Sequence, residues 1–448
     1  MYDVKDFDIR FLSLSIRYGF ESSKYVLQGL KVRSYTSIVD HIKTMGFNTI
    51  RVSFSGQMLN KTTSPAAADV DYTLNKDLVG LTPLQCLDAL VSYCGRVGVR
   101  IILTRSSCYA DGQFKEPYWF VSNDTYFTRQ RYVADWQLLA KRYGGKENAY
   151  MVIVICILIY CFSVVSTVVG ADLWDQPVAP YAAWNWAGPK TADWRVGAQT
   201  AGNAILAVNP QWLIFVAGLG FNGWAGSDLT GVRNSPLVLT LPNQLVYSTH
   251  DLSQDAYIQP YFLNSSYPAN LRDVWRSRWG YLHEQGVSPV FMGSFGTYFN
   301  YPVADDQWLK ALVRYMNGEF KRDNITNLLQ GQKGMSWAVG IGSIGVGSIG
   351  VLKSDFQTVN AMVPYLKSAL APLLSGPLPS SQPTVKPSGK PSSAPHSASP
   401  TLPQPTYTST LRPTNVLAGS KYFQKFSTRG SQIIDENGNS IRMTGVNW

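Results

Sequence analysis

Helical and strand-like patterns alternate along most of this chain, and that alternation constrains the fold more than any other feature. Apolar residues at helical spacing over 34–45 end at Gly46, and a strand-like run follows at 48–54. Strands separated by helices predict a parallel sheet with right-handed crossovers. Counted this way, the chain has one strand fewer than the eight of a closed (β/α)8 barrel. The further helices are expected at 84–97, 129–142 and 193–208, and the further strands at 100–103, 166–173, 212–216, 244–248, 289–293 and 335–339.

The C-terminal part of the chain changes character twice. Residues 376–420 are rich in Pro, Ser and Thr with almost no apolar periodicity, which predicts an extended, solvated linker. Residues 421–448 then contain a hairpin pattern at 431–443, in which Asn437 and Gly438 suit a two-residue type I′ turn. The last residues, 444–448, continue as a strand that would supply the missing eighth.

Several motifs resemble those of glycoside hydrolase family 5, the cellulase-type retaining glycosidases. Residues 170–177 resemble the strand that ends in the family's Asn-Glu-Pro, and residues 289–297 resemble its Pro-Val-x-x-Gly-Glu-Phe-Gly-Thr. The family's entry motif, Gly-x-Asn-Trp followed by Gly-Phe-Glu, is split between residues 445–448 and residues 19–21. The resemblance covers residues 18–375 and 424–448. It implies an α/β fold, the (β/α)8 TIM barrel, and an extracellular protein that acts on β-glucan or cello-oligosaccharide in polysaccharide catabolism.

The order of these motifs is that of a circular permutation, because the family's N-terminal hairpin stands at the C-terminal end of this chain. The first strand is therefore either supplied by that hairpin or missing. A Pro-rich linker of about 45 residues, at about 3.1 Å each, is long enough to let residues 421–448 close the same barrel. The tail also has the sequence expected of a truncated second copy of the domain, or of a rearranged gene. These interpretations stay open.

The two catalytic positions implied by the resemblance have lost their carboxyl groups. A retaining glycosidase needs two carboxyl groups about 5 to 5.5 Å apart, one as acid/base and one as nucleophile. Here Gln176 stands at the acid/base position and Ser294 at the nucleophile position. An amide cannot release a proton as an acid does, and a serine without an adjacent base is a poor nucleophile. We therefore predict a pseudoenzyme with little or no hydrolysis.

The substrate-side positions implied by the resemblance are partly altered as well. Arg51 and His250 keep the family residue, whereas Asp175 replaces an Asn, Ser106 a His and Leu252 a Tyr. Aromatic side chains stack on the flat faces of sugar rings, but they also fill cores. The candidates for such stacking are Trp184 and Trp224, with Trp119 and Trp186.

Charge and cysteine usage argue against several other classes of protein. The net charge is +10, yet no dense run of Lys and Arg suggests a nucleic-acid partner. The five cysteines and four histidines lack the spacing of a zinc site, so we expect no metal and no cofactor. We expect a monomer.

Two segments do not fit the barrel pattern. Residues 151–169 carry no charge and are long enough to span a membrane, but a span there would cut the barrel before its fourth strand. We interpret residues 147–165 as an insertion or as translated non-coding sequence, and membrane attachment as the less favoured alternative. Residues 1–17 lack the basic start of a signal peptide, so no secretion signal is visible.

Four functions remain open on the sequence alone. The chain is an active β-1,4-glucan hydrolase, a silent carbohydrate-binding barrel, a decayed gene product without a stable fold, or a membrane-attached protein. Hydrolysis of carboxymethyl-cellulose, binding of cello-oligosaccharides, cooperative unfolding and partition into detergent distinguish them in that order.

Overall fold

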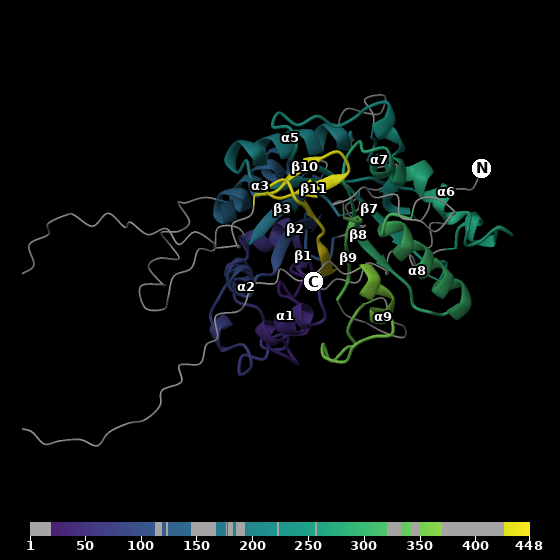
Figure 1. Ribbon diagram of the computed structural model, residues 1–448. Helices are drawn as coiled ribbons and strands as arrows, with labels where there is room; N and C mark the ends of the chain where they lie inside the picture. The colour runs from purple at the N-terminus through teal and green to yellow at the C-terminus, as the bar shows by residue number, and fades with distance from the viewer. Residues whose placement is uncertain are drawn as a thin grey trace, which may run out of the picture. The chain divides into compact units, whose positions relative to one another are not determined.

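Eight parallel strands close a barrel in the order β1-β13-β9-β8-β7-β4-β3-β2 (Figure 1). Seven of them lie in the seven runs expected from the sequence, and β13 comes from the C-terminal tail. The α/β barrel is confirmed, with its first strand supplied by the tail. The bounds are β1 (Thr49–Ser55), β2 (Arg100–Ser107), β3 (Val168–Asp172), β4 (Leu213–Ala217), β7 (Leu245–Leu252), β8 (Val290–Gly296), β9 (Ser336–Gly340) and β13 (Thr444–Asn447).

The structure is a computed structural model that describes residues 19–112, 119–121, 124–144, 167–175, 177, 182–184, 193–221, 224–255, 258–319, 333–341, 350–369 and 425–448. The chain divides into two units, residues 1–373 with 422–448 and residues 374–421, and every described residue belongs to the first. The expected leader at 1–17, insertion at 147–165 and linker at 376–420 lie outside the described residues.

The helices begin and end where the sequence provides capping residues. Ser34 accepts a hydrogen bond from the backbone of Ser37 at the start of α1, and Thr82 and Gln85 form a capping box at the start of α2. Gly98 ends α2 with a left-handed φ of 76°. The α-helices are α1 (Tyr35–Thr44), α2 (Pro83–Val97), α3 (Arg129–Gly144), α5 (Trp194–Val208), α6 (Leu271–Trp275), α7 (Tyr281–Glu284), α8 (Pro302–Met316) and α9 (Val363–Leu366).

Shorter elements join these helices and strands. A π-helical turn, η8 (Arg276–Gly280), connects α6 to α7, and β5 (Leu219–Phe221) pairs antiparallel with β6 (Trp224–Asp228). The short 3-10 turns are η3 (Gly56–Asn60), η4 (Lys76–Leu78), η6 (Thr230–Arg233), η7 (Pro260–Leu263) and η9 (Lys367–Ala369).

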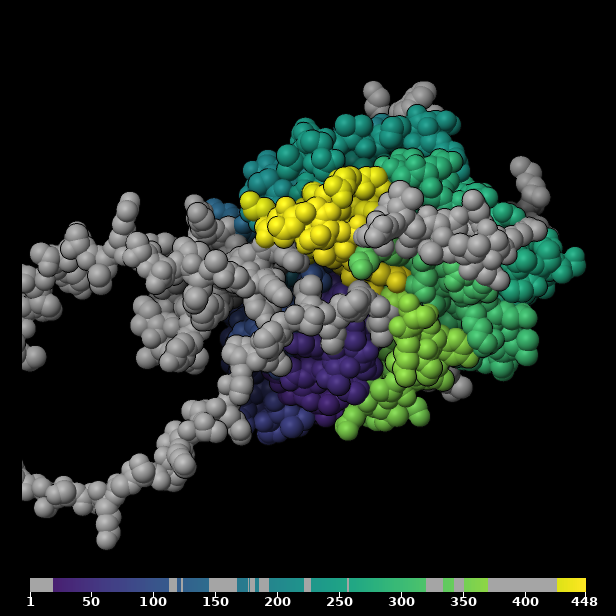
Figure 2. Space-filling view, in the orientation of Figure 1, coloured from purple at the N-terminus to yellow at the C-terminus, as the bar shows by residue number. Residues whose placement is uncertain are grey.

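Strand β13 lies between β1 and β9 and pairs in parallel with both. In Figure 1 this yellow strand descends into the barrel wall, and in Figure 2 the yellow segment lies between teal and green parts of the surface. Trp448 continues the pairing, since its N–H donates to the carbonyl of Arg51 over 2.8 Å and its carbonyl accepts from Ser53 over 3.2 Å. Its indole Nε1 also donates to the carbonyl of Gln28 over 2.8 Å. The tail is therefore part of the barrel wall.

A small antiparallel sheet precedes β13 and fills the amino end of the barrel. It consists of β10 (Ser427–Arg429), β11 (Gln432–Ile434) and β12 (Ser440–Ile441). Three apolar side chains of this segment, Phe426, Ile433 and Met443, belong to the buried cluster that also contains the barrel-lining residues of β2, β3, β4, β7, β8 and β9. Burying these side chains removes apolar surface from water on both the tail and the barrel.

The expected hairpin is present, but the two-residue type I′ turn predicted for it is not. A type I′ turn needs positive φ at both central residues. Gly438 has a φ of 78°, but the φ of Asn437 is not positive. The Asp435 carboxylate accepts hydrogen bonds from the backbone of Asn437 and Asn439 at 2.9 and 2.8 Å, which stabilises a longer loop. The two-residue turn instead joins β10 to β11 at Gly430 and Ser431.

No helix among the described residues is long and apolar enough to cross a membrane. Most of the uncharged run at 151–169 lies outside the described part of the chain. Its last two residues, Val168 and Val169, are buried and begin β3.

Candidate active site

The carboxyl ends of the barrel strands carry the candidate site, as expected for this fold. Its centre is Arg51 on β1, whose side chain is 2% exposed. The guanidinium Nε donates to Asp172 on β3 over 2.8 Å, and Nη2 donates to Asp175, just beyond β3, over 2.5 Å. Two uncharged side chains complete the set, with Thr104 on β2 accepting over 3.0 Å and Asn447 on β13 over 3.4 Å.

Burial and charge act together on this cluster. Taking a guanidinium out of water is unfavourable unless carboxylates and hydrogen bonds compensate. Burial opposes the charge of Arg51, but Asp172 and Asp175 outweigh it, so the pKa of Arg51 is raised. Burial raises the pKa of Asp172 to about 6, although Arg51 acts in the other direction. Arg51 is therefore firmly cationic, and the proton affinity of Asp172 is increased.

His250 on β7 lies on the other side of Asp175. Its Nε2 is 3.8 Å from the Oδ1 of Asp175, and its side chain is 2% exposed. Burial lowers the pKa of His250 to about 4, with Arg51 contributing and Asp175 partly offsetting the shift. The imidazole is therefore neutral at pH 7.

Ser294 on β8 is a register partner of His250 and is half-buried. The residue before it, Gly293, accepts a hydrogen bond from Asn447 Nδ2 over 3.0 Å. A Cβ on Gly293 would lie 2.9 Å from the hydroxyl of Ser248 and 3.3 Å from His250 Nε2, so only glycine allows this close approach of β8 to β7. Ser294 therefore follows a residue whose backbone is bonded to Asn447, and it lies beside His250 in the sheet.

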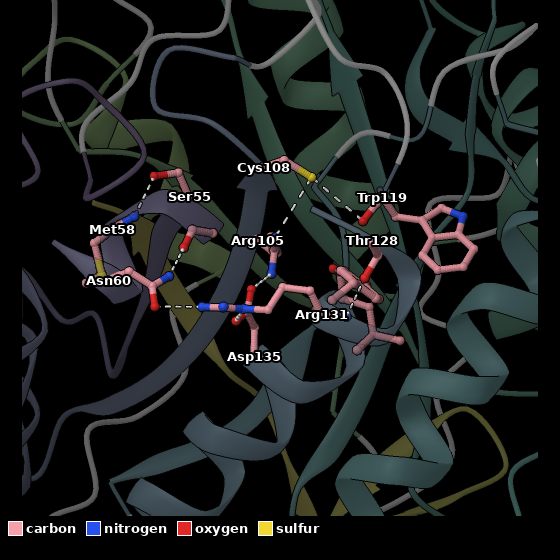
Figure 3. Close-up of polar contacts among 12 residues, drawn as sticks. Ser55, Met58, Asn60, Arg105, Cys108, Trp119, Thr128, Arg131 and Asp135 are labelled. Atoms are coloured by element: carbon pink, nitrogen blue, oxygen red, sulfur yellow. Dashed lines mark hydrogen bonds and ion pairs between the residues drawn. The ribbon is translucent and has the colours of Figure 1, made fainter. Parts of the chain in front are cut away.

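The arginine next to Thr104 faces away from this cluster, as alternation along β2 requires. Figure 3 shows that Arg105 points to Asp135 of α3, with Nη1 and Oδ2 separated by 2.7 Å. Asp135 also binds Arg131 over 2.5 Å, and Arg131 reaches Asn60 Oδ1 over 2.7 Å. The side chain of Arg105 therefore links β2 to α3, while its backbone carbonyl accepts a hydrogen bond from the N–H of Asp175 over 2.9 Å.

The comparisons with known proteins agree with this geometry. The family described as Cellulase (glycosyl hydrolase family 5) matches residues 17–156 and 164–328. The chain belongs to this family. An endoglucanase of Paenibacillus polymyxa is 38% identical over 307 residues, which cover 67% of this chain and 70% of that protein. The major extracellular endoglucanase of Xanthomonas campestris pv. campestris is 29% identical over 311 residues, which cover 67% of this chain and 58% of that protein.

Solved cellulase structures share the barrel. A variant of the endocellulase from Pyrococcus horikoshii in complex with cellotetraose has a TM-score of 0.65 at 27% identity, over 79% of this chain and 90% of that one. The catalytic domain of the Xanthomonas campestris endoglucanase has a TM-score of 0.63 at 26% identity, over 78% of this chain and 92% of that one. The fold and family expected from the sequence are confirmed.

Of the two catalytic positions implied by the resemblance, the structure describes position 294 but not position 176. Ser294, at the position that the resemblance implies for the nucleophile, lies near the carboxyl end of β8 and is the register partner of His250. Gln176 lies outside the described residues, between Asp175 and Pro177. Ser106 and Leu252 lie near the carboxyl ends of β2 and β7, Ser106 buried and Leu252 half-buried.

Two of the tryptophans expected to stack on sugar are core residues in this structure. Trp184 is 4% exposed, and its Nε1 donates to the carbonyl of Ser235 over 3.0 Å. Trp119 is 7% exposed and packs on Phe120 and Tyr132. Neither ring presents a face to a ligand in this conformation. Trp186 and the side chain of Trp224 lie outside the described part of the chain.

Among the described residues, Asp251 and Glu21 are further buried carboxyl groups with hydrogen-bond partners of their own. The Asp251 carboxylate accepts from Trp308 Nε1 of α8 over 3.4 Å, on the outer side of β7. Glu21, 3% exposed, accepts from the backbone of Gly19 over 3.2 Å. Within the described ranges, no group of three or more His, Cys, Asp or Glu could hold a metal ion.

Sequence reasoning missed three members of the cluster. Asp172, Thr104 and Asn447 were read as parts of strands or of a motif, and none was given a role at the site. Each is polar, almost fully buried, and lies in the carboxyl half of its strand. A buried polar residue at the carboxyl end of a barrel strand is the signal that could have identified them.

Proposed function

We propose that this cellulase-family chain binds β-glucan at the carboxyl ends of its barrel strands and hydrolyses it little or not at all. The observation that supports the loss of hydrolysis is the position of Ser294, a half-buried alcohol beside a neutral His250. A serine attacks only when a base takes its proton, and His250, whose pKa burial lowers to about 4, is a weak base. Acetal cleavage also needs an acid, and Gln176 cannot be one.

Binding requires much less of the site than catalysis does. A sugar is recognised by hydrogen bonds to its hydroxyl groups and by aromatic or apolar contacts, and neither needs an ionisable pair. The amide of Gln176 and the hydroxyl of Ser294 can each donate and accept such hydrogen bonds. The related Pyrococcus horikoshii endocellulase was solved with cellotetraose, which makes cellotetraose the natural probe for this chain.

The test has a binding arm and a hydrolysis arm. Cellotetraose is titrated into the purified full chain by calorimetry, and release of reducing ends from carboxymethyl-cellulose is measured on the same preparation. We expect a measurable dissociation constant below the millimolar range and hydrolysis indistinguishable from a blank. A flat titration up to millimolar cellotetraose removes the binding proposal, and reducing ends above the blank remove the loss of hydrolysis.

An active hydrolase is the second candidate, and the 38% identity to a protein named endoglucanase favours it. The double variant Gln176→Glu with Ser294→Glu provides the comparison, and Ser294→Ala is its matched control. If the parent chain and the Ser294→Ala variant both hydrolyse carboxymethyl-cellulose at the same rate, position 294 is not the nucleophile and another carboxyl group does the chemistry.

Three further proposals concern the chain as a whole. We propose that it acts outside the cell, since one relative is named as a major extracellular endoglucanase. We propose that it is a monomer, which size-exclusion chromatography with light scattering tests.

We also propose that residues 147–165 are an insertion, because the family match omits residues 157–163. Sequencing the transcript across this segment tests whether it is translated.

A further inference from the structure

The cluster around Arg51 contains one basic side chain and two acidic ones, Asp172 and Asp175. Asp172 and Asp175 both place an oxygen within 2.6 Å of Arg51 Nη2. The side chain of Asp172 is 0% exposed and that of Asp175 is 12% exposed. A single guanidinium can balance one of these charges fully, so the second carboxyl group is a source of repulsion unless it holds a proton.

The two carboxyl groups differ in their access to water. Complete burial raises the pKa of Asp172 to about 6, so this group is the readier of the two to accept a proton. Asp175 keeps some contact with solvent and makes the shorter contact with the guanidinium. Asp175 is therefore the partner of Arg51 on the side of the cluster that water reaches, while Asp172 contacts both Nε and Nη2 of the guanidinium from the buried side.

Position 294 is connected to the same cluster by two routes. One runs from Arg51 through Asn447 to the carbonyl of Gly293, with separations of 3.4 and 3.0 Å. The other runs from Asp175 to His250, the register partner of Ser294. The family motifs carry an Asn at position 175 and a Glu at position 294, and this chain carries Asp and Ser. Compared with those motifs, this chain has an acidic side chain at position 175 and lacks one at position 294.

We propose that Asp175 is a positioning residue, the counter-ion that holds Arg51 in a site without a carboxylate at position 294, and that its charge opposes the return of one. The titratable groups that face Asp175 among the described residues are Arg51 from β1, Asp172 from β3 and His250 from β7. This assignment concerns the protein without sugar and does not depend on whether the chain binds or cleaves glucan.

A double-mutant cycle between Asp175→Asn and Ser294→Glu tests the assignment by chemical denaturation of the full chain at pH 7. We expect each single variant to lower the folding equilibrium constant, and Ser294→Glu to raise it when introduced into the Asp175→Asn background. The coupling between the two changes should be about tenfold or more. The matched control is Asp251→Asn, at a buried acid on β7 that does not contact Arg51, and its effect should simply add to that of Ser294→Glu.

Two further readouts distinguish a counter-ion from a residue that only packs. The loss caused by Ser294→Glu alone should shrink between pH 7 and pH 5, because protonation relieves repulsion between carboxylates. The pKa of His250, followed by NMR, should fall in Asp175→Asn, because Asp175 raises it in the parent chain. If Asp175→Asn does not fold, the pH response of Ser294→Glu still decides the question. A Ser294→Glu variant that is more stable than the parent at pH 7, or additivity in the cycle, would overturn the assignment.

The same assignment predicts how hydrolysis can be restored. In the Gln176→Glu with Ser294→Glu background, Asp175→Asn should raise the rate on carboxymethyl-cellulose by at least about tenfold, because it frees Arg51 for the new carboxylate. A double revertant that is already fully active, with no gain from Asp175→Asn, contradicts the role of Asp175. It leaves the proposed loss of hydrolysis in the parent chain intact, so the two proposals fail separately.

Discussion

Asn447 donates a hydrogen bond from its side-chain amide to the backbone carbonyl of Gly293 over 3.0 Å. The donor lies one residue before the last residue of the chain, and the acceptor lies one residue before Ser294 at the candidate nucleophile position. The carbonyl oxygen of the same side chain accepts from Arg51, which is 396 positions away in sequence. The tail therefore completes the site as well as the barrel wall, and loss of its attachment should affect both.

Arg442 attaches the tail to the end of α8. Its guanidinium donates to the carbonyls of Met316 and Met335 and to Asn317 Oδ1, over 3.0, 2.8 and 2.8 Å. Arg442→Ala removes a donor from each of these three acceptors, so we expect the free energy of unfolding to fall by about 1 to 3 kcal/mol. Urea denaturation measures the change.

The matched control for Arg442 is Arg429, an exposed arginine of the same small sheet. Its Nη2 donates to the carbonyl of Gly438 over 2.8 Å at the surface. Arg429→Ala should change the free energy of unfolding by less than about 0.5 kcal/mol. Equal effects of the two substitutions would mean that the tail is not held by Arg442.

Asp135 is the shared partner of two arginines behind β2. It binds Arg105 over 2.7 Å and Arg131 over 2.5 Å, and its side chain is 3% exposed. Asp135→Asn leaves the fully buried charge of Arg105 without a carboxylate, so we expect a loss of about 3 to 5 kcal/mol in the free energy of unfolding. The comparison is Asp88→Asn at the partly exposed pair of Asp88 and Arg142, where about 1 kcal/mol or less is expected. A smaller loss at Asp135 than at Asp88 contradicts this account.

The sequence predicted the barrel well because the relevant patterns are local. Seven strands and the four helices α1, α2, α3 and α5 follow from apolar spacing within windows of a few residues and from caps such as Ser34 and Thr82. The helices α6, α7, α8 and α9 were not predicted. The turn predicted after Ile434 was wrong, for a reason that the spacing of apolar residues cannot reveal. The Asp435 side chain binds two backbone N–H groups and stabilises a longer loop than the Asn-Gly pair suggests.

The site was predicted less completely because its contacts join distant parts of the chain. Arg51, Asp175 and His250 were expected from motifs, but the pairing of Arg51 with Asp172 spans 121 positions. Trp184 shows the same limit for aromatic residues. Composition cannot tell a ring that packs in the core from one that faces a sugar, since both need large apolar surfaces.

Asp251 should make the protein less stable as pH rises towards neutrality. Burial raises the pKa of Asp251 to about 7, whereas an Asp in an unfolded chain titrates near pH 3.9. Between about pH 4 and 7 the folded state binds more protons than the unfolded state, so stability falls as pH rises. Asp251→Asn keeps an acceptor for Trp308 without ionising, and should be roughly 2 to 4 kcal/mol more stable than the parent at pH 7.5 but not at pH 4.5.

Asp306→Asn should change the pH dependence of stability in the opposite direction in the same experiment. Burial acts to raise the pKa of Asp306, but hydrogen bonds from Lys310 and Tyr365 outweigh it and lower the pKa. The stability that Asp306 contributes is therefore present above the pKa of the unfolded chain and is lost in acid. Thermal unfolding of both variants from about pH 2.5 to 7.5 should show slopes that differ from the parent in opposite directions, above about pH 4 for Asp251→Asn and below it for Asp306→Asn. Parallel slopes for Asp251→Asn and the parent would show that Asp251 does not titrate in this range.

Trp184 should matter for stability and not for sugar binding. Its ring is buried, its Nε1 is bonded to Ser235, and a Cβ at Gly231 would approach its Cδ1 to 2.3 Å, so the pocket around the ring is tightly packed. Trp184→Ala should lower the free energy of unfolding by about 3 to 5 kcal/mol, because it leaves a cavity and an unpaired carbonyl. The dissociation constant for cellotetraose, measured by calorimetry at a temperature where the variant is folded, should stay within about twofold of the parent, since the ring has no free face to contribute. Trp184→Phe should restore part of the stability with the same affinity. A large loss of affinity in a Trp184→Phe variant of normal stability would place this ring at the sugar site after all.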